Sequence, residues 1–281
     1  MTRAVEIQGH IASMDELLDI VGAMRSLAGM RVQEAQRALP GIRRYAESMA
    51  EAIGAALLLM SPPSSAVSAR GHQALVLCAA EHGFVGGFNE RLVEAAEAAL
   101  EARGLLFVLG SRGAALALER GRQTSWMRPM ATRPASAPET VNHLTTELYA
   151  RIARGEISRV EVMFCRYRQG GAPAIQRHLL LPLDIASLAA RQPRQAPLHN
   201  LAPRPLLEKL MAEYVFALLT EATVESISSE NAARFAAMDS AHDNVTRKLS
   251  QLRQSAQEAR QTEITDELLD LITGAEAQTS H

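Results

Sequence analysis

Two long stretches of the chain show the hydrophobic spacing of a coiled coil. No glycine or proline occurs between Pro205 and Gly274, which leaves 68 uninterrupted residues, from Leu206 to Thr273. As one helix they would reach about 100 Å, longer than a compact domain is wide. In the second half of this stretch the seam residues recur at alternating spacings of four and three: Met238, His242, Val245, Leu249, Leu252, Ala256 and Ala259. This spacing predicts a coiled-coil helix, which needs a partner.

The N-terminal segment offers that partner. The same alternation occurs at Ile7, Ile11, Met14, Leu18, Val21, Ala28, Val32, Ala35 and Leu39, and Arg25 is the one charged residue on this seam. Pro40-Gly41 predicts a bend or an end of the helix, and helical character then resumes up to Pro62. We therefore expect two long terminal helices that form a left-handed antiparallel coiled coil.

Between these helices the pattern changes to alternating strands and helices. Strands are predicted at 72–80, 104–110, 157–168 and 174–185, with a Gly-Gly turn at 170–171, and helices at 90–103, 111–121 and around 137–154. This order is typical of a small sheet with parallel members and helices on both faces. The predicted fold class is α/β. Its parts are shaft helices at 1–61 and 206–281, and a Rossmann-like central domain at 62–205 that ends in the proline-rich linker 190–205.

The amino-acid composition argues against several classes of protein. The formal net charge is only −2, so the whole chain has no electrostatic reason to bind nucleic acid. Cys78 and Cys165 are isolated in apolar runs, which favours buried thiols in a reducing compartment over a disulfide or a zinc site. No run has the length of a signal peptide or a membrane span. We therefore expect a soluble cytoplasmic protein that can still attach to a membrane complex.

The glycine-rich segment 79–93 is a candidate phosphate site. Its sequence is AAEHGFVGGFNERLV, with glycines at 83, 86 and 87. A phosphate-binding P-loop closes with Lys-Ser/Thr, and a dinucleotide site needs G-x-G-x-x-G, and neither motif is present. An anion at the start of the following helix would compete with Glu90. A structural turn or a contact loop is favoured over a nucleotide site.

Other candidates for chemistry are equally weak. Ser111 is better explained as a helix cap than as a nucleophile, and the histidines lack the spacing of metal ligands. His242 fits a tolerated polar position in the seam, with a pH-sensitive role as the alternative. We expect no catalytic residue, cofactor or metal site. The C-terminal end instead carries four bulky apolar residues, Leu268, Leu269, Leu271 and Ile272, which predict insertion into a partner.

Nearly from end to end, the chain resembles a known family, the gamma subunit of the F-type ATP synthase. EIQGHIAS followed by AMRSLAGMRVQEAQ is similar to the family's first helix, HGFVGGFN to its D-R-G-L-C-G-G-x-N loop, and VLGSRG to its I-G-S-K-G turn. GEISRVEVMFCRY and LLPL correspond to its central strands. The C-terminal segments SENAARFAAMDSAHDN and ARQTEITDELLDLITGAEA carry the most specific similarity.

The resemblance implies a central rotor that turns inside the alpha/beta hexamer and couples transmembrane ion flow to ATP synthesis or hydrolysis. The nucleotide chemistry would lie in beta, with no direct nucleotide binding here. The implied partners are alpha, beta, epsilon and the membrane c-ring, at the cytoplasmic face of the bacterial inner membrane. The positions that match the family's partner contacts are Gly83, Gly86, Gly87, Asn89, Arg260, Gln261, Leu268, Leu269, Leu271 and Ile272.

The chain also departs from the family pattern. Asp19 and Gly22 occupy positions where the family's first helix has lysine, and Glu81-His82 and Phe84-Val85 replace Asp-Arg and Leu-Cys in the loop. These changes put the usual match between a basic shaft and acidic arms of beta in doubt. They motivate the hypothesis of a divergent rotor that is matched to its own alpha and beta chains. The alternatives are a cytoplasmic coiled-coil adaptor and an independent nucleotide-binding enzyme.

Overall fold

The structure is a computed structural model that describes residues 3–60, 71–168, 171, 173–191 and 198–279. Its two longest helices are α1 (Arg3–Leu57) and α6 (Pro203–Thr279). The chain divides into two compact units, residues 28–234 and residues 1–27 with 235–281. We refer to the first as the sheet unit and to the second as the helical unit, and each is described by itself. The division of the chain at residues 61 and 205 stays a prediction.

A five-stranded sheet forms the centre of the sheet unit, in the order β3-β2-β1-β4-β5. The strands are β1 (His72–Cys78), β2 (Leu105–Leu109), β3 (Trp126–Arg128), β4 (Ile157–Arg166) and β5 (Ala174–Leu181). The first four are parallel, and β5 pairs antiparallel with β4. β1 has six consecutive buried residues, as expected for a strand that is covered on both faces.

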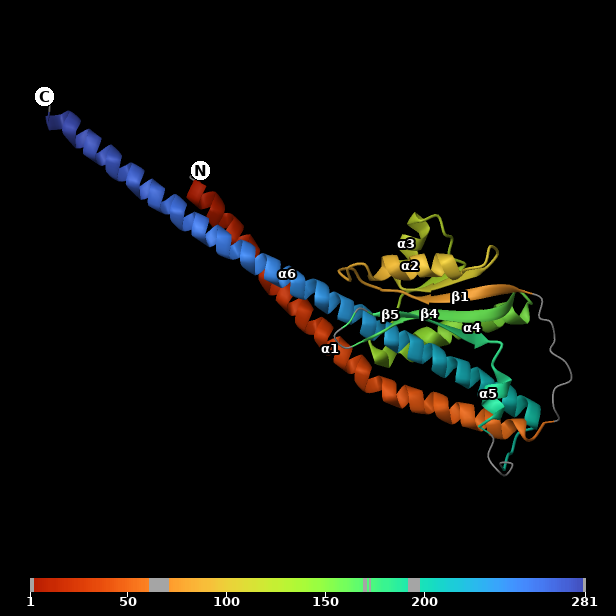
Figure 1. The fold of residues 1–281 in the computed structure, drawn as a ribbon. Helices are drawn as coiled ribbons and strands as arrows, with labels where there is room; N and C mark the ends of the chain where they lie inside the picture. The colour runs from red at the N-terminus through yellow and green to blue at the C-terminus, as the bar shows by residue number, and fades with distance from the viewer. Residues whose placement is uncertain (1–2, 61–70, 169–170, 172, 192–197, 280–281) are drawn as a thin grey trace. The chain divides into compact units, whose positions relative to one another are not determined.

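Helices cover both faces of this sheet (Figure 1). They include α2 (Phe88–Ala99) and α3 (Ser111–Glu119) on one face and α4 (Ala137–Ala153), preceded by a short 3₁₀ turn at Pro134–Ser136, on the other. The short helix α5 (Ile185–Ala189) packs instead on α1, where Leu188 joins Ala50 and Ile53. Side chains alternate between the two faces of a strand, so β1 contributes Val76 to one core and Leu77 to the other. The sheet therefore lies between two separate hydrophobic layers.

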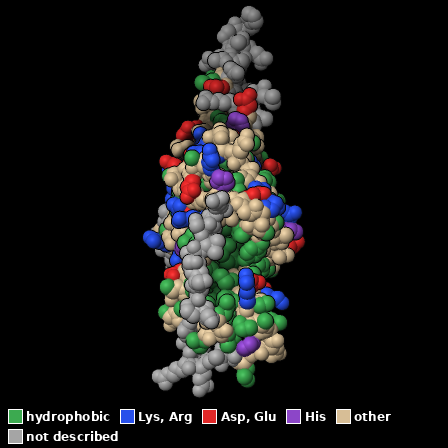
Figure 2. Space-filling model, turned by 90° about the vertical axis from the view of Figure 1, so that its right-hand side faces the viewer, with side chains coloured by type: hydrophobic (Ala, Val, Ile, Leu, Met, Phe, Trp, Pro, Cys, Tyr) green, Lys and Arg blue, Asp and Glu red, His purple; other side chains and the backbone are tan. Residues whose placement is uncertain are grey.

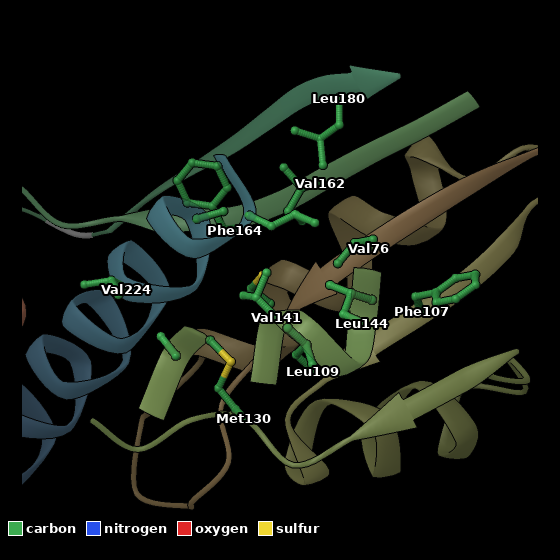
Figure 3. Close-up of a cluster of buried hydrophobic side chains, with 14 of the residues drawn as sticks. Val76, Phe107, Leu109, Met130, Val141, Leu144, Val162, Phe164, Leu180 and Val224 are labelled. Atoms are coloured by element: carbon green, nitrogen blue, oxygen red, sulfur yellow. The ribbon is translucent and has the colours of Figure 1, made fainter. Parts of the chain in front are cut away.

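The larger layer joins α4, α1 and α6 to the sheet. Its buried residues include Val76, Phe107, Val141, Val162, Phe164 and Val224, shown in Figure 3. The layer on the other face joins α2 and α3 to the sheet. Burying one such Val, Leu or Phe side chain stabilises a protein by about 1.5–3 kcal/mol. The stability of the sheet unit therefore depends on the parts of both long helices that belong to it, because they complete the larger layer.

Most of the predicted strands and helices are confirmed, and several boundaries are corrected. α1 continues through Pro40, because buried residues on both sides of it, including Leu39 and Ala46, pack in one continuous pattern and offset the lost backbone hydrogen bond. α6 begins at Pro203 and includes Gly274. The sequence did not predict β3 and α5, which are short. The predicted Gly-Gly turn falls partly outside the described residues, as does the middle of the linker.

The helical unit consists of the first part of α1 and the last part of α6, which lie side by side (Figure 1). Two ion pairs between the helices show that they run antiparallel: Arg25–Asp239 at 2.9 Å and Asp15–Arg253 at 3.1 Å. Every seam residue described in this unit is buried or partly buried, including Ile11, Met14, Leu18, Val21, Met238, Val245, Leu249 and Leu252. The predicted coiled-coil pairing is thus confirmed.

Candidate functional site

The loop between β1 and α2 has the backbone of a tight turn. Phe84 and Gly86 adopt left-handed conformations with φ of 61° and 54°. Glycine adopts such values readily, whereas an aromatic residue rarely does. Val85 is buried in the core under α2 and α3, while the Phe84 side chain is 68% exposed. The turn therefore buries one of its two bulky residues and presents the other at the surface.

The Glu81 carboxylate faces inward and joins three segments. It accepts hydrogen bonds from the backbone N–H of Ser111 at 3.0 Å, the Ser111 hydroxyl at 2.8 Å and the backbone N–H of Met130 at 2.8 Å. Burial by itself raises the pKa of Glu81, but these hydrogen bonds outweigh burial and hold the pKa below its usual value. Glu81 thus satisfies an N–H at the start of α3, where a negative charge is also favourable.

α6 holds the same loop from the other side. Arg234 donates hydrogen bonds to the backbone oxygens of His82 and Gly83, both at 3.2 Å, and to the Asn231 amide oxygen at 3.0 Å. Its guanidinium also pairs with the Glu230 carboxylate at 2.6 Å, and both side chains are at most 10% exposed. Burial raises the pKa of Glu230, and the neighbouring guanidinium opposes that effect. The hydrophobic pattern and the motifs did not reveal this buried pair, although the four-residue spacing of Glu and Arg in SENAARF was a signal.

α6 also fills the place where related sheets bind ligands. The strand order makes the carboxyl ends of β1 and β4 the switch point of the sheet, the usual site of a ligand crevice in doubly wound folds. Here the Ser226 hydroxyl donates to the Cys78 carbonyl at 2.6 Å, and the Ser229 hydroxyl donates to the Cys165 carbonyl at 2.8 Å. Both serines are buried. The crevice is therefore occupied by the protein's own helix.

The loop residues singled out from the sequence have different surroundings. Asn89 is only 7% exposed, and its amide oxygen accepts the Ala80 N–H at 3.0 Å. Gly83 and Gly87 have open space where a side chain would be, so packing does not require glycine there. An open groove of about 320 Å³ lies along the loop and α3, lined in part by Phe84, Arg112 and Leu116. The loop is thus held from inside by the hydrogen bond to buried Asn89, whereas its outer side, with Phe84, is accessible.

The C-terminal residues singled out from the sequence belong to the helical unit. Arg260 and Gln261 are exposed on α6, and Leu268, Leu269 and Ile272 are 54%, 55% and 55% exposed. Leu271 lies within the helix, but its side chain is outside the described part of the chain. The antiparallel register places Leu18 beside Leu249. At this register the described start of α1, Arg3, lies near the level of residue 264, and the apolar residues beyond that level extend past it.

The structure does not bring all of these residues together. The glycine loop is in the sheet unit, and the C-terminal group is in the helical unit. Among the described residues no group of His, Cys, Asp or Glu side chains is arranged to hold a metal ion, and none of the described helices has the length and hydrophobicity of a membrane span.

Hydrophobic side chains gather in the middle of the face in Figure 2, with charges of both signs scattered around them.

The Glu81 contacts lead to a prediction about acid. A carboxyl group with a lowered folded pKa stabilises the fold above its unfolded pKa of about 4.3, and this stabilisation is lost as the pH falls through the folded value. We expect Glu81→Gln to lower the free energy of unfolding by about 1–2 kcal/mol at neutral pH, because charged hydrogen bonds are lost. Urea denaturation of both proteins should show this difference shrinking in acid. A difference that does not change with pH would contradict the assignment.

Comparisons of the sequence with known proteins all indicate the same family. The family model described as ATP synthase matches residues 3–278. The ATP synthase gamma chain of Moorella thermoacetica is 26% identical over 289 residues, covering 99% of each chain. That of Streptomyces avermitilis is 28% identical over 285 residues, covering 95% of this chain and 93% of the relative.

Solved structures show the same fold. A chain in the rotor of the Euglena gracilis mitochondrial ATP synthase superimposes with a TM-score of 0.63 at 10% identity, covering 93% of this chain and 98% of that chain. A chain in the central stalk and c-ring structure of the Tetrahymena thermophila mitochondrial ATP synthase gives 0.58 at 16% identity, covering 79% and 99%. At such identities the likeness concerns the fold alone.

Proposed function

The chain belongs to the ATP synthase family as a gamma-type central stalk subunit, and from this premise we propose how its surfaces are used. The helical unit serves as the shaft that turns inside the alpha/beta head, and the sheet unit serves as the foot that rests on the c-ring. Rotation of the shaft then couples ion flow to ATP synthesis or hydrolysis in the head. The observation that supports this most strongly is the continuous match over both units, residues 3–278.

The finer assignments follow the matched positions. We propose that the outer edge of the loop, Gly83, Gly86 and Gly87, faces beta, and that Asn89 supports this loop from inside. Arg260 and Gln261, which are exposed, would contact a loop of beta during rotation. The apolar C-terminal residues would sit in a bearing at the top of the head, because an apolar group of this kind is costly to leave in water.

Two further partners complete the proposal. The foot would contact an epsilon subunit as well as the c-ring, and the complex would lie at the cytoplasmic face of the bacterial inner membrane. The interior of the foot supports a mechanical role. α6, which continues into the shaft, is hydrogen-bonded to the carboxyl ends of β1 and β4 where other folds bind ligands. The adaptor alternative is not favoured, because the gamma-chain relatives align along nearly all of this chain.

Reconstitution tests the proposed function. The chain is expressed with its own alpha and beta chains, and the assembly is assayed for co-purification and ATP hydrolysis. We expect a stable complex in which hydrolysis depends on this chain. Recovery of the chain without alpha and beta, or an alpha/beta assembly whose hydrolysis is unaffected by it, would contradict the proposal.

The proposed bearing contact gives a sharper prediction. Replacing Leu268 and Ile272 together by serine removes two exposed apolar side chains, each able to contribute on the order of 1 kcal/mol when buried by a partner. Together these amount to about 2 kcal/mol, so we expect about thirtyfold weaker retention in the alpha/beta head, measured by dissociation after dilution. The matched control replaces Gln257 and Thr262, exposed on the same helix, by serine. Equal retention of the two double variants would argue against a bearing contact.

A further inference from the structure

Four charged side chains meet where α1, α6 and the end of β4 pack together in the sheet unit. Arg43 of α1 donates from Nε to the Glu221 carboxylate at 2.9 Å and from a terminal nitrogen to the Glu225 carboxylate. Arg166, the last residue of β4, has its Nε 3.3 Å from the same Glu225 oxygen, as an ion pair without hydrogen-bond geometry. Only 2% of the Glu225 side chain is exposed. We call these four residues the Glu225 cluster.

Net stability does not explain the Glu225 cluster. Its two arginines face two glutamates, so no charge is left over to hold a ligand. Burial raises the pKa of Glu225, and Arg43 and Arg166 oppose that effect. Because desolvation of a buried ion pair can cost more than the attraction returns, well-packed apolar side chains often hold the same elements at least as firmly. A buried charge at this point is therefore not accounted for by stability alone.

What the cluster adds to apolar packing is a fixed direction. The hydrophobic layer that joins the same elements is non-directional, whereas charged hydrogen bonds restrict both distance and angle. Two other polar contacts join α1 to α6 in this unit, Gln36–Ser228 at 2.8 Å and Tyr45–Glu213 at 2.9 Å, but neither of them reaches the sheet. Among the ion pairs of the described residues, only the Glu225 cluster links both long helices to a strand.

We propose that Glu225, held by Arg43 and Arg166, is a positioning residue of the rotor, which fixes the rotation of α1 and α6 about their own axes against β4. The proposal rests on the proposed function, in which torque passes between the foot and the shaft. Both helices continue from the sheet unit into the helical unit, and a helix transmits rotation as a rigid element. Loosening the cluster would therefore lose part of each rotation between shaft and foot, while the chemistry in the head proceeds.

The test removes the central pair without leaving a buried charge unpaired. The double variant Arg43→Met with Glu225→Met replaces the pair by apolar side chains and leaves Arg166 facing Glu221. The matched control is Glu97→Met with Arg120→Met, an ion pair at 3.7 Å in the same unit that joins α2 to the end of α3 and involves neither long helix. Urea denaturation of the free chain should show an equal or higher midpoint for the Arg43/Glu225 variant, because the desolvation cost is removed.

Coupling is measured in sealed vesicles that hold the complete complex with its own alpha, beta and membrane chains. The membrane potential, read with a voltage-sensitive dye, is divided by the ATP hydrolysed. For the Arg43/Glu225 variant we expect hydrolysis within about twofold of wild type and a potential per ATP of about half or less, since a small misplacement far from the chemistry is costly. The control should match wild type. A merely structural defect would lower assembly and hydrolysis together instead.

A second measurement uses the free chain. Spin labels are attached through Glu47→Cys on α1 and His143→Cys on α4, both exposed, while Cys78 and Cys165 are buried and stay unlabelled. In the Arg43/Glu225 variant the distance distribution between the labels should shift or broaden by about 1–2 Å, the size of a small helix shift. The control variant should leave it unchanged.

A wild-type potential per ATP in the Arg43/Glu225 variant would overturn the positioning role, whatever the label distances, and would leave the proposed function intact. Loss of stability or of assembly in that variant would overturn it as well, because the cluster would then be structural. Equal uncoupling in the control variant would remove the link to the long helices. Failure of the wild-type chain to assemble with alpha and beta would overturn the proposed function itself, and the label distances would still report on the cluster.

Discussion

Replacing Arg234 by methionine is expected to destabilise the sheet unit by about 3–5 kcal/mol, because the change leaves the buried Glu230 carboxylate without its partner. The change also removes the donors that hold the backbone oxygens of His82 and Gly83. Urea denaturation should therefore show a lower midpoint. Amide hydrogen exchange should become faster in the loop that follows β1 as well as in α6.

The chain offers a matched control on the same helix. Arg204 and Glu208 form an ion pair at the same four-residue spacing, at 3.2 Å, but their side chains are 82% and 65% exposed. Arg204→Met should change the free energy of unfolding by less than about 0.5 kcal/mol, since exposed pairs of this kind contribute little. Combining Arg234→Met with Glu230→Gln should recover part of the loss, because no buried charge is then unpaired. Similar effects of the Arg204 and Arg234 changes would contradict the role of burial.

The second large effect is expected at Gly113. A β-carbon at this position in α3 would lie 2.1 Å from the Ala79 β-carbon, which is attached directly to the backbone and cannot swing away. Gly113→Ala should therefore push α3 away from the end of β1 and lower the free energy of unfolding by about 1–3 kcal/mol. The ordinary gain from replacing a helical glycine by alanine, about 0.5–1 kcal/mol, does not offset this overlap.

Two further variants separate crowding from helix propensity. Gly41 lies inside α1 in the same unit, and a β-carbon added there would meet no other atom within 4 Å, so Gly41→Ala should be neutral or stabilising. Combining Gly113→Ala with Ala79→Gly exchanges which element supplies the methyl group, and it should recover most of the lost stability. If that double variant is no more stable than Gly113→Ala alone, close contact between α3 and β1 is not the cause.

The loop after β1 shows how far sequence reasoning reached at the site. The missing lysine and hydroxyl argued against a phosphate loop, and the φ values of the turn agree with a structural or contact role. From the sequence, the four departures from the family pattern in this loop looked equally able to alter partner contacts. The structure separates them: Glu81 and Val85 face inward, whereas Phe84 is exposed. A substitution pattern alone gives no direction for a side chain, because that direction depends on the turn's backbone angles.

The sequence by itself determined the terminal helices, their heptad seam and the alternating order of strands and helices in the middle. These features follow from local periodicity, because buried and exposed positions recur with the period of the helix or strand to which they belong. Only the tertiary structure decided that α1 continues through Pro40, that α6 fills the crevice at β1 and β4, and that Arg234 holds the Glu81 loop. Those outcomes depend on contacts between distant residues, such as Arg234 and Gly83, which are 151 positions apart. A local pattern carries no information about which distant segment supplies the compensating packing or hydrogen bond.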